Sequence, residues 1–147
     1  MPKSSKPIEP RAACILYAED EEDDILFLRL ALKRAKSAGT LNVVTNGEEA
    51  VQYLDGRGVF GDRARYPLPA LVLLDINMPM KSGLEVLKWI REQPRFKSLP
   101  VVMLTSSMRD KDMEEARRLG ADDFLFKPSA PGGLDELVRV FHKRWLG

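Results

Sequence analysis

Four short stretches of the sequence carry the side chains that could do chemistry, and each directly follows an apolar run. They are Glu19-Asp20, Asp75, Thr105-Ser106-Ser107 and Lys127-Pro128. Three acidic positions facing one another would repel unless a cation lay among them, and a small, incompletely filled set of oxygen ligands suits hydrated Mg²⁺. A hydroxyl and an ammonium beside that cation would hold a phosphoryl group. These residue types predict a phosphoryl-binding site, provided that the fold brings the four stretches together.

Each stretch also has an ordinary interpretation when it is taken alone. Asp75 could be a loop aspartate, Thr105 a helix cap and Lys127 a lone exposed lysine. The acidic run continues from Glu21 to Asp24, and we interpret these four carboxylates as a solvated helix N-terminus, which the macrodipole favours. Only the first two acidic residues of the run directly follow the apolar segment, so only they are expected to reach a shared site.

The hydrophobic pattern predicts five strands that alternate with five helices. The expected strands are short, mostly apolar runs at residues 14–18, 41–45, 70–75, 101–106 and 124–127. Apolar positions between and after these runs recur at helical spacing within residues 25–39, 50–54, 84–91, 113–119 and 134–145. Strands that are apolar on successive residues predict a parallel sheet covered on both faces, which is a doubly wound α/β fold. Ligands of such folds bind beyond the carboxyl ends of the strands.

The composition is that of one ordinary globular domain, with 147 residues, 44% hydrophobic and 31% charged. A formal net charge of +1 gives no global field, so we expect neither nucleic acid nor a membrane surface as a partner. The single Cys14 excludes an intramolecular disulfide and a thiolate metal cluster. Residues 1–12 are expected to be a flexible segment without a signal peptide and residues 13–147 to form the domain, in a cytoplasmic protein.

The motifs in combination resemble the receiver domain of two-component response regulators. They are an acidic pair after the first strand, DINMP (residues 75–79) after the third, Thr-Ser after the fourth and Lys-Pro after the fifth. The resemblance extends from about Ala13 to Leu146. It implies a five-stranded parallel sheet of order 2-1-3-4-5 with five helices, in agreement with the hydrophobic pattern.

The resemblance implies that Asp75 accepts a phosphoryl group. Asp20 and Asp75 would bind Mg²⁺ together with the backbone carbonyl of Asn77, and Glu19 would act through a water molecule. Asn77 and Ser107 stand at family positions that tune the lifetime of the acyl phosphate. The donor would be a phosphohistidine of a sensor histidine kinase. Such a protein is no enzyme toward external substrates, although it catalyses its own phosphorylation and dephosphorylation.

The resemblance also implies which residues respond to the phosphoryl group. Thr105 and Lys127, with Ser106 beside them, would hold phosphoryl oxygens, and the peptide bond between Lys127 and Pro128 would be cis. Phe124 could rotate into space that Thr105 vacates, although the family often has a tyrosine there. A core phenylalanine is the alternative interpretation of Phe124.

The expected output is a change in protein contacts on the surface formed by the fourth helix, the fifth strand and the last helix. Its partner would be a downstream protein, a relay protein or a second copy of the chain. Because the sequence ends at Gly147, directly after the last helix, we expect no attached output domain.

The segment 55–70, DGRGVFGDRARYPLPA, is longer than the usual connection between a helix and a strand. It resembles the extended loop of stand-alone receivers that pair with bacterial phytochrome-type histidine kinases. A surface insertion without function and an element that contacts the kinase or a second copy are both consistent with its composition.

Three other functions fit the sequence less well. A flavodoxin-like protein needs a phosphate-binding loop after the first strand, where this chain has six carboxylates. A haloacid-dehalogenase-type phosphatase typically has a second aspartate two residues after its nucleophile, where this chain has Asn77. A scaffold receiver that works without phosphorylation usually lacks a site residue, whereas all are present here. The scaffold remains the strongest of the three alternatives because it shares the receiver motifs, although the complete set of site residues speaks against it.

Overall fold

The computed structural model of the protein describes residues 14–37 and 39–146. Within them, five parallel strands form one sheet: β2 Cys14–Ala18, β3 Thr40–Val44, β4 Leu71–Leu74, β5 Val101–Thr105 and β6 Asp123–Phe126. The order across the sheet is β3-β2-β4-β5-β6, with all neighbouring pairs parallel. Counted along the described chain this is the predicted order 2-1-3-4-5, so the doubly wound fold is confirmed. The predicted flexible segment 1–12 lies outside the described residues.

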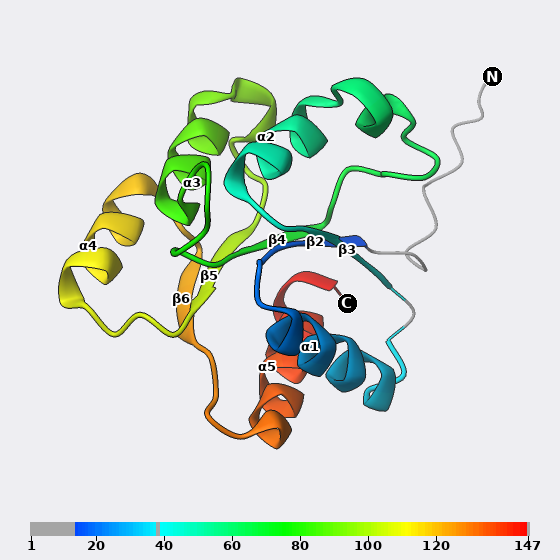
Figure 1. The fold of residues 1–147 in the computed structure, drawn as a ribbon, viewed down its shortest axis with the longest axis vertical. Coiled ribbons are helices and arrows are strands. Elements are labelled where there is room, and N and C mark those ends of the chain that lie inside the picture. Colours follow the sequence, from blue (N-terminus) through cyan, green and yellow to red (C-terminus); the bar gives the residue numbers. More distant parts are fainter. Residues whose placement is uncertain (1–13, 38, 147) are drawn as a thin grey trace.

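Helices cover both faces of the sheet (Figure 1). The α-helices of the described chain are α1 Glu22–Arg34, α2 Gly47–Asp55, α3 Gly83–Glu92, α4 Asp110–Leu119 and α5 Leu134–Phe141. Short 3₁₀ turns lie at Gly58–Gly61, Pro94–Phe96 and Pro131–Gly133, and a π-helical turn follows at His142–Leu146. α1 and α5 lie on one face of the sheet, and α2, α3 and α4 lie on the other (Figure 1).

The core consists of two hydrophobic clusters, one on each face of the sheet. Leu71 and Leu73 of β4 belong to the cluster with Phe141 of α5, whereas Val72 and Leu74 belong to the cluster on the face of α2 and α3. Successive residues of a strand point to opposite faces, and burial of both faces explains why this strand is apolar throughout. The strand ends are thereby held in fixed positions.

Two helices end earlier than the hydrophobic pattern predicts. The pattern after the first strand continues to Gly39, but α1 ends at Arg34 because Lys36 adopts a left-handed backbone conformation with φ of 56°. The last helix is predicted to continue to Trp145, but its α-helical part ends at Phe141 and the chain goes on as a π-helical turn. The side-chain pattern does not distinguish these geometries over a single turn.

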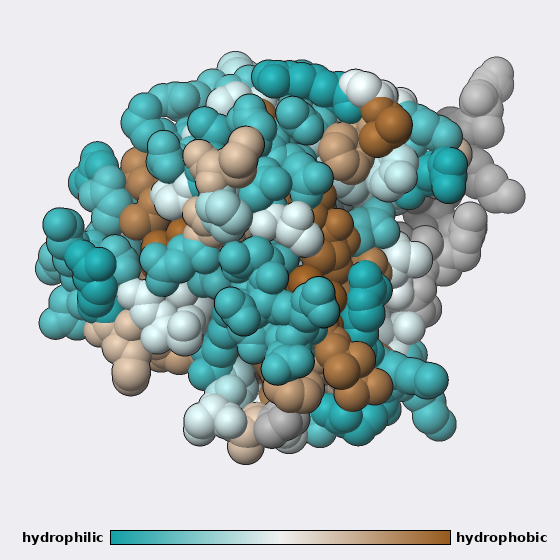
Figure 2. Space-filling model, in the orientation of Figure 1, coloured by the Kyte–Doolittle hydropathy of each residue, from teal (hydrophilic) through white to brown (hydrophobic). Residues whose placement is uncertain are grey.

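The surface seen in Figure 2 is mainly hydrophilic and is crossed by a band of apolar residues. Exposed large apolar side chains include Leu26 and Leu30 of α1, which lie one helical turn apart, and Val59 and Leu68 between α2 and β4. None of the described helices has the length and hydrophobicity to cross a membrane.

Candidate functional site

The four predicted stretches lie at the carboxyl edge of the sheet, where backbone hydrogen bonds fix them. The N–H of Asp75 donates to the carbonyl of Ala18 at the end of β2, with an N···O distance of 3.1 Å. The N–H of Lys127 donates to the carbonyl of Thr105 at the end of β5, at 2.8 Å. Strand pairing therefore continues as far as Asp75 and Lys127, so the backbone positions of these two residues are fixed.

The predicted acidic group is formed. Glu19, Asp20 and Asp75 each have a carboxylate oxygen, and these three oxygens lie within 4.8 Å of one another. Glu19 is fully buried and Asp75 is only 5% exposed, whereas Asp20 faces solvent. We refer to these three residues as the acidic trio. Close carboxylates of this kind repel one another, so the site needs positive charge.

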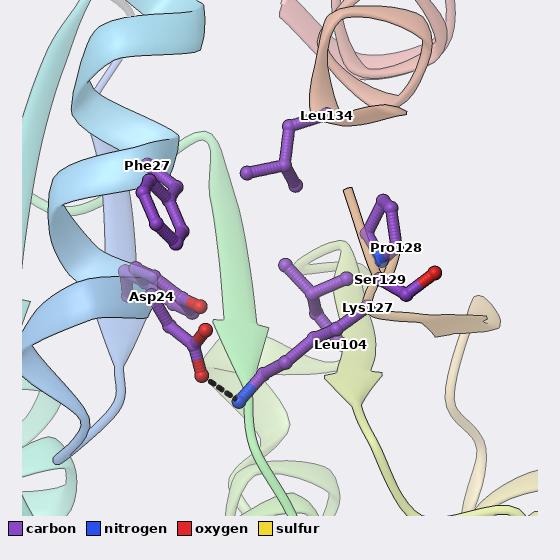
Figure 3. Close-up of a pocket in the computed structure, with 8 residues that line it drawn as sticks. Asp24, Phe27, Leu104, Lys127, Pro128, Ser129 and Leu134 are labelled. Atoms are coloured by element: carbon purple, nitrogen blue, oxygen red, sulfur yellow. Dashed lines mark hydrogen bonds and ion pairs between the residues drawn. The ribbon is translucent and has the colours of Figure 1, made fainter. Parts of the chain in front are cut away.

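Lys127 supplies part of that charge. Its ammonium Nζ lies 2.5 Å from Oε1 of Glu19 and 3.1 Å from Oδ2 of Asp75. A third carboxylate, Asp24 of α1, lies 2.7 Å from the same nitrogen (Figure 3). Burial lowers the pKa of Lys127, but its hydrogen bonds to Asp24 and Glu19 and the charge of Asp75 outweigh burial and hold this pKa above its ordinary value. Lys127 is therefore charged at neutral pH.

Glu19 is the most enclosed member of the acidic trio. Its Oε1 accepts a hydrogen bond from the hydroxyl of Tyr17 at 3.2 Å, and its Oε2 accepts one from the N–H of Glu21 at 3.1 Å. Burial raises the pKa of Glu19 to about 7, although hydrogen bonding to Lys127 lowers it, and the charge of Asp75 raises it further. Additional positive charge in the site would favour the ionised form of Glu19.

One oxygen of Asp75 has no protein partner among the described residues. Its Oδ2 bonds Lys127, whereas its Oδ1 is buried and accepts no hydrogen bond. An unsatisfied buried carboxylate oxygen is costly, and a divalent cation held by the acidic trio would satisfy it. The donor set consists of oxygens, which Mg²⁺ prefers, and the residues present therefore fit such an ion. Asn77 lies exposed two residues beyond Asp75.

Gly83, the first residue of α3, lies against the backbone of Asp75. The N–H of Gly83 donates to the carbonyl of Ile76 at 3.0 Å. A Cβ atom at Gly83 would lie 2.1 Å from the carbonyl oxygen of Asp75, so only glycine allows the helix to approach this closely. A capping box between Ser82 and Glu85 fixes the start of the same helix.

Thr105 is buried at the end of β5 and bonds its own loop. Its Oγ1 accepts a hydrogen bond from the N–H of Ser107 at 3.1 Å. The hydroxyl of Ser107 donates to Oδ2 of Asp112 in the first turn of α4, at 2.6 Å. Ser106 between them is exposed. These contacts join the end of β5 to the start of α4.

Phe124 lies on β6, at the edge of the sheet. Its side chain is partly buried and packs against the core cluster on the face of α2 and α3. Its ring centroid is 5.7 Å from that of Phe126, which is exposed. The two rings form an apolar patch beside α4.

The predicted cis peptide bond before Pro128 is wrong. No cis peptide bond occurs in the described chain, and Lys127 reaches Glu19 and Asp75 with a trans bond. The trans isomer is the more stable form of an X-Pro bond by about 0.5–1 kcal/mol, and nothing in the site requires the other isomer.

Asp24 is the residue that the sequence interpretation missed. It was assigned to a solvated helix N-terminus, yet it is half-buried and bonds Lys127. Helical spacing carries a signal for this contact, because Asp24 precedes the fully buried Leu28 by four residues and therefore shares its face of α1. Asp23, which lies on another face, is exposed as predicted.

The segment 55–70 is held against α2 by specific contacts. Nη1 of Arg63 donates to the carbonyls of Tyr53 and Tyr66 at 2.9 and 3.1 Å, and the hydroxyl of Tyr53 donates to the carbonyl of Pro67 at 2.8 Å. The rings of Tyr53, Phe60 and Tyr66 pack together with centroid distances of 5.1–5.9 Å. The segment thus has a defined conformation of its own.

Comparison with known families agrees with the geometry of the site. The model of the response regulator receiver domain matches residues 15–139. The chain belongs to this family. Response regulator Rcp1 of Synechocystis is 32% identical over 132 residues, which cover 90% of this chain and 88% of that protein. The solved Mn²⁺-bound form of Rcp1 has a TM-score of 0.80 at 31% identity and covers 91% of this chain and 94% of that one.

Two further solved receivers are similar over nearly the whole chain. The phosphorylated cyanobacterial phytochrome response regulator RcpA has a TM-score of 0.85 at 30% identity, covering 92% of this chain and 95% of that one. Response regulator RPA3017, from red light signalling of R. palustris, has a TM-score of 0.84 at 34% identity, covering 90% and 93%. This receiver is therefore similar to stand-alone phytochrome response regulators.

Proposed function

We propose that this receiver takes a phosphoryl group onto Asp75 from the phosphohistidine of a sensor histidine kinase, in a Mg²⁺-dependent reaction. The observation that carries the proposal is the divided environment of Asp75. Its Oδ2 bonds Lys127, and its buried Oδ1 lacks a partner among the described residues but lies in the acidic trio. A carboxylate arranged in this way is fixed and incompletely satisfied, as a phosphoryl acceptor should be.

In the transfer step an oxygen of Asp75 attacks phosphorus roughly in line with the bond to the histidine nitrogen. The new O–P bond forms as the P–N bond breaks, and the electron pair of that bond stays on the imidazole. Lys127 lies 3.1 Å from Asp75 and offsets negative charge on the transferring group. Asp20, Asp75 and the carbonyl of Asn77 would hold Mg²⁺, with Glu19 acting through water, and the ion would supply further positive charge there.

The phosphorylated state ends when water hydrolyses the acyl phosphate, which restores the carboxylate of Asp75. Asn77 and Ser107 stand at the family positions that tune this step, and we assign to them the control of its rate. Ser107 is fixed by its bond to Asp112, and Asn77 is exposed. The protein would thus limit the lifetime of its own signal.

The output is a change of protein contacts on α4, β6 and α5. A phosphoryl group offers new acceptors to Thr105, with Ser106 beside it, so the hydroxyl of Thr105, whose oxygen accepts from the N–H of Ser107, would turn to donate its O–H to a phosphoryl oxygen. Movement of that loop changes the space around Phe124, which is only partly buried. The recognising partner is a downstream or relay protein, or a second copy that forms a homodimer through this surface.

We further propose that the cognate kinase is of the phytochrome type. Support comes from the relatives RcpA and RPA3017, whose names connect them with phytochrome and red light, and from the ordered segment 55–70. Val59 and Leu68 of that segment are exposed and available for a contact. A scaffold that acts without phosphorylation is disfavoured because it would not need the acidic trio and Lys127 together.

The test is phosphorylation of the purified protein by a small donor. We expect acetyl phosphate with Mg²⁺ to give one phosphoryl adduct by intact mass, removed by hydroxylamine as acyl phosphates are. The adduct should be absent without Mg²⁺ and absent from Asp75→Asn. An unmodified wild-type protein, or an equal adduct on Asp75→Asn, would reject the proposal and favour the scaffold.

A further inference from the structure

Lys127 has three carboxylate partners, and they differ in kind. Glu19 and Asp75 belong to the acidic trio that can hold a cation, whereas Asp24 does not. Asp24 comes from the first turn of α1, and its Oδ2 lies 2.7 Å from Nζ of Lys127 (Figure 3). This distance is intermediate between those to Oε1 of Glu19, at 2.5 Å, and to Oδ2 of Asp75, at 3.1 Å. Asp24 is therefore the partner that remains to Lys127 when a cation and a phosphoryl group engage the other two.

The start of α1 leaves Asp24 free for this contact. An acidic side chain at the third helical position commonly folds back to the N–H of the N-cap residue. Here the N-cap is Glu21, and its N–H already donates to Oε2 of Glu19. Asp24 instead points across to the end of β6, as Figure 3 shows. The contact joins two elements that are 103 residues apart in sequence.

The surroundings strengthen this ion pair. The side chain of Lys127 is 12% exposed and that of Asp24 is 32% exposed. Beside the pair lies a cavity of about 120 Å³, lined by apolar side chains such as Phe27 and Leu134 and also by Ser129 and the pair itself (Figure 3). The limited exposure of both side chains reduces screening, so the attraction exceeds that of a surface pair.

We propose that Asp24 is a positioning residue of the phosphorylation site: it holds the ammonium of Lys127 beside Asp75 and thereby leaves Asp75 open to a cation and a phosphoryl group. The inference rests on the proposed function of Asp75. Without Asp24, Lys127 has only Glu19 and Asp75 as partners, so it moves onto the acidic trio and competes there with the cation.

The test uses three single substitutions in the full chain. Asp24→Asn keeps the size of the side chain and removes its charge, Asp24→Glu keeps the charge, and Asp23→Asn removes the same charge from the neighbouring exposed position. Mg²⁺ affinity is measured by calorimetry, and the rate of adduct formation is measured with acetyl phosphate at saturating Mg²⁺. For Asp24→Asn we expect Mg²⁺ binding and the rate each to fall by about tenfold. Asp23→Asn should change either by about twofold or less, and Asp24→Glu should recover most of the loss.

A double-mutant cycle separates positioning from a general electrostatic or structural effect. In a Lys127→Gln background there is no ammonium to hold, so Asp24→Asn should weaken Mg²⁺ binding no more than Asp23→Asn does. An equal effect of Asp24→Asn in both backgrounds would overturn the inference, as would equal effects of Asp24→Asn and Asp23→Asn in the wild-type background. Absence of any adduct on the wild-type protein would instead reject the proposed function, so the two failures are distinguishable.

Discussion

We call the side of the sheet where the strands begin its amino edge and the side where they end its carboxyl edge. Each side carries a half-buried cation, and the two cations differ in how completely their surroundings satisfy them. At the amino edge, Arg91 of α3 donates to the carbonyls of Phe96, Leu99 and Gly120 and pairs with Asp122, at distances of 2.8–3.0 Å. These partners are mostly neutral carbonyls in fixed directions, which match the fork of a guanidinium. The amino edge is a closed network.

At the carboxyl edge, Lys127 faces three carboxylates, and a fourth, Asp20, lies within the acidic trio. One ammonium cannot neutralise four acids, and Oδ1 of Asp75 has no partner in the part of the chain that the structure describes. The comparison teaches that a completed polar network fixes the fold, whereas an incomplete one marks the place where a ligand completes it. Substitutions at the two edges should therefore affect different properties.

Lys127→Gln should give the largest effect on the reaction. Loss of the ammonium removes the charge that faces the transferring phosphoryl group, so adduct formation with acetyl phosphate at saturating Mg²⁺ should slow by about 1,000-fold. The matched control is Lys111→Gln, an exposed lysine of α4, whose rate should equal that of the wild type. A Lys127→Gln protein that reacts at the wild-type rate would remove Lys127 from the reaction.

Arg91→Met should give the largest effect on stability. It keeps the aliphatic part of the side chain but leaves the carbonyls of Phe96, Leu99 and Gly120 without the guanidinium. Asp122 loses its charged partner and keeps only its bond from the N–H of Val101, so the free energy of unfolding should fall by about 4 kcal/mol. Urea denaturation measures this, with Arg118→Met as the control, because Arg118 pairs only with Glu115 on the surface of α4 among the described residues. Under folding conditions, Arg91→Met should be phosphorylated at the wild-type rate. A selective loss of reactivity without loss of stability would contradict the division between the two edges.

The carboxyl edge should also make stability depend on pH in the absence of Mg²⁺. The pKa of Glu19 is raised from 4.5 to about 7 in the folded protein, so the unfolded chain releases this proton first. The free energy of unfolding should therefore decrease as the pH rises from about 4.5 to 7 and then level off, by about 3 kcal/mol in all. Urea denaturation at several pH values measures this change, and Glu19→Gln should remove it. Identical pH profiles of the wild type and Glu19→Gln would show that the pKa of Glu19 is not raised in the folded protein.

Ser107→Ala should give the smallest of these effects. It removes the hydrogen bond to Asp112 that joins the end of β5 to α4, so the free energy of unfolding should fall by about 1 kcal/mol. Ser106→Ala is the control, since Ser106 is exposed and a surface change should cost less than about 0.5 kcal/mol. Equal stabilities of the two variants would show that the Ser107 contact adds nothing in solution.

The sequence predicts the carboxyl edge well and the amino edge hardly at all, for a physical reason. A strand that is buried on both faces fixes where its last residue lies, so the positions of Glu19, Asp75, Thr105 and Lys127 follow from the hydrophobic pattern and the sheet order. Gly120 is likewise predictable as the end of α4, because its φ of 99° favours glycine. These features depend on local sequence and on topology.

Contacts between helices and loops depend on packing that no local pattern encodes. The bond from Lys127 to Asp24 requires the position of α1 relative to β6, and the carbonyls around Arg91 come from two separate segments, the connection between α3 and β5 and the end of α4. The order of segment 55–70 depends in the same way on Tyr53 and Arg63. The predicted cis bond at Pro128 came from resemblance alone and is wrong, while the flexible residues 1–12, the bounds of the domain and the cytoplasmic location stay predictions.

The central claim is that the open network around Asp75 is completed by a cation and a phosphoryl group. The most direct measurement is a crystal structure of the protein with Mg²⁺ and beryllofluoride, a mimic of the phosphoryl group. We predict the mimic on an oxygen of Asp75, the cation among the acidic trio, and Lys127 in contact with both the mimic and Asp24. Under the same conditions, an Asp75 that binds neither group, with Lys127 still bonded to its Oδ2, would contradict the account.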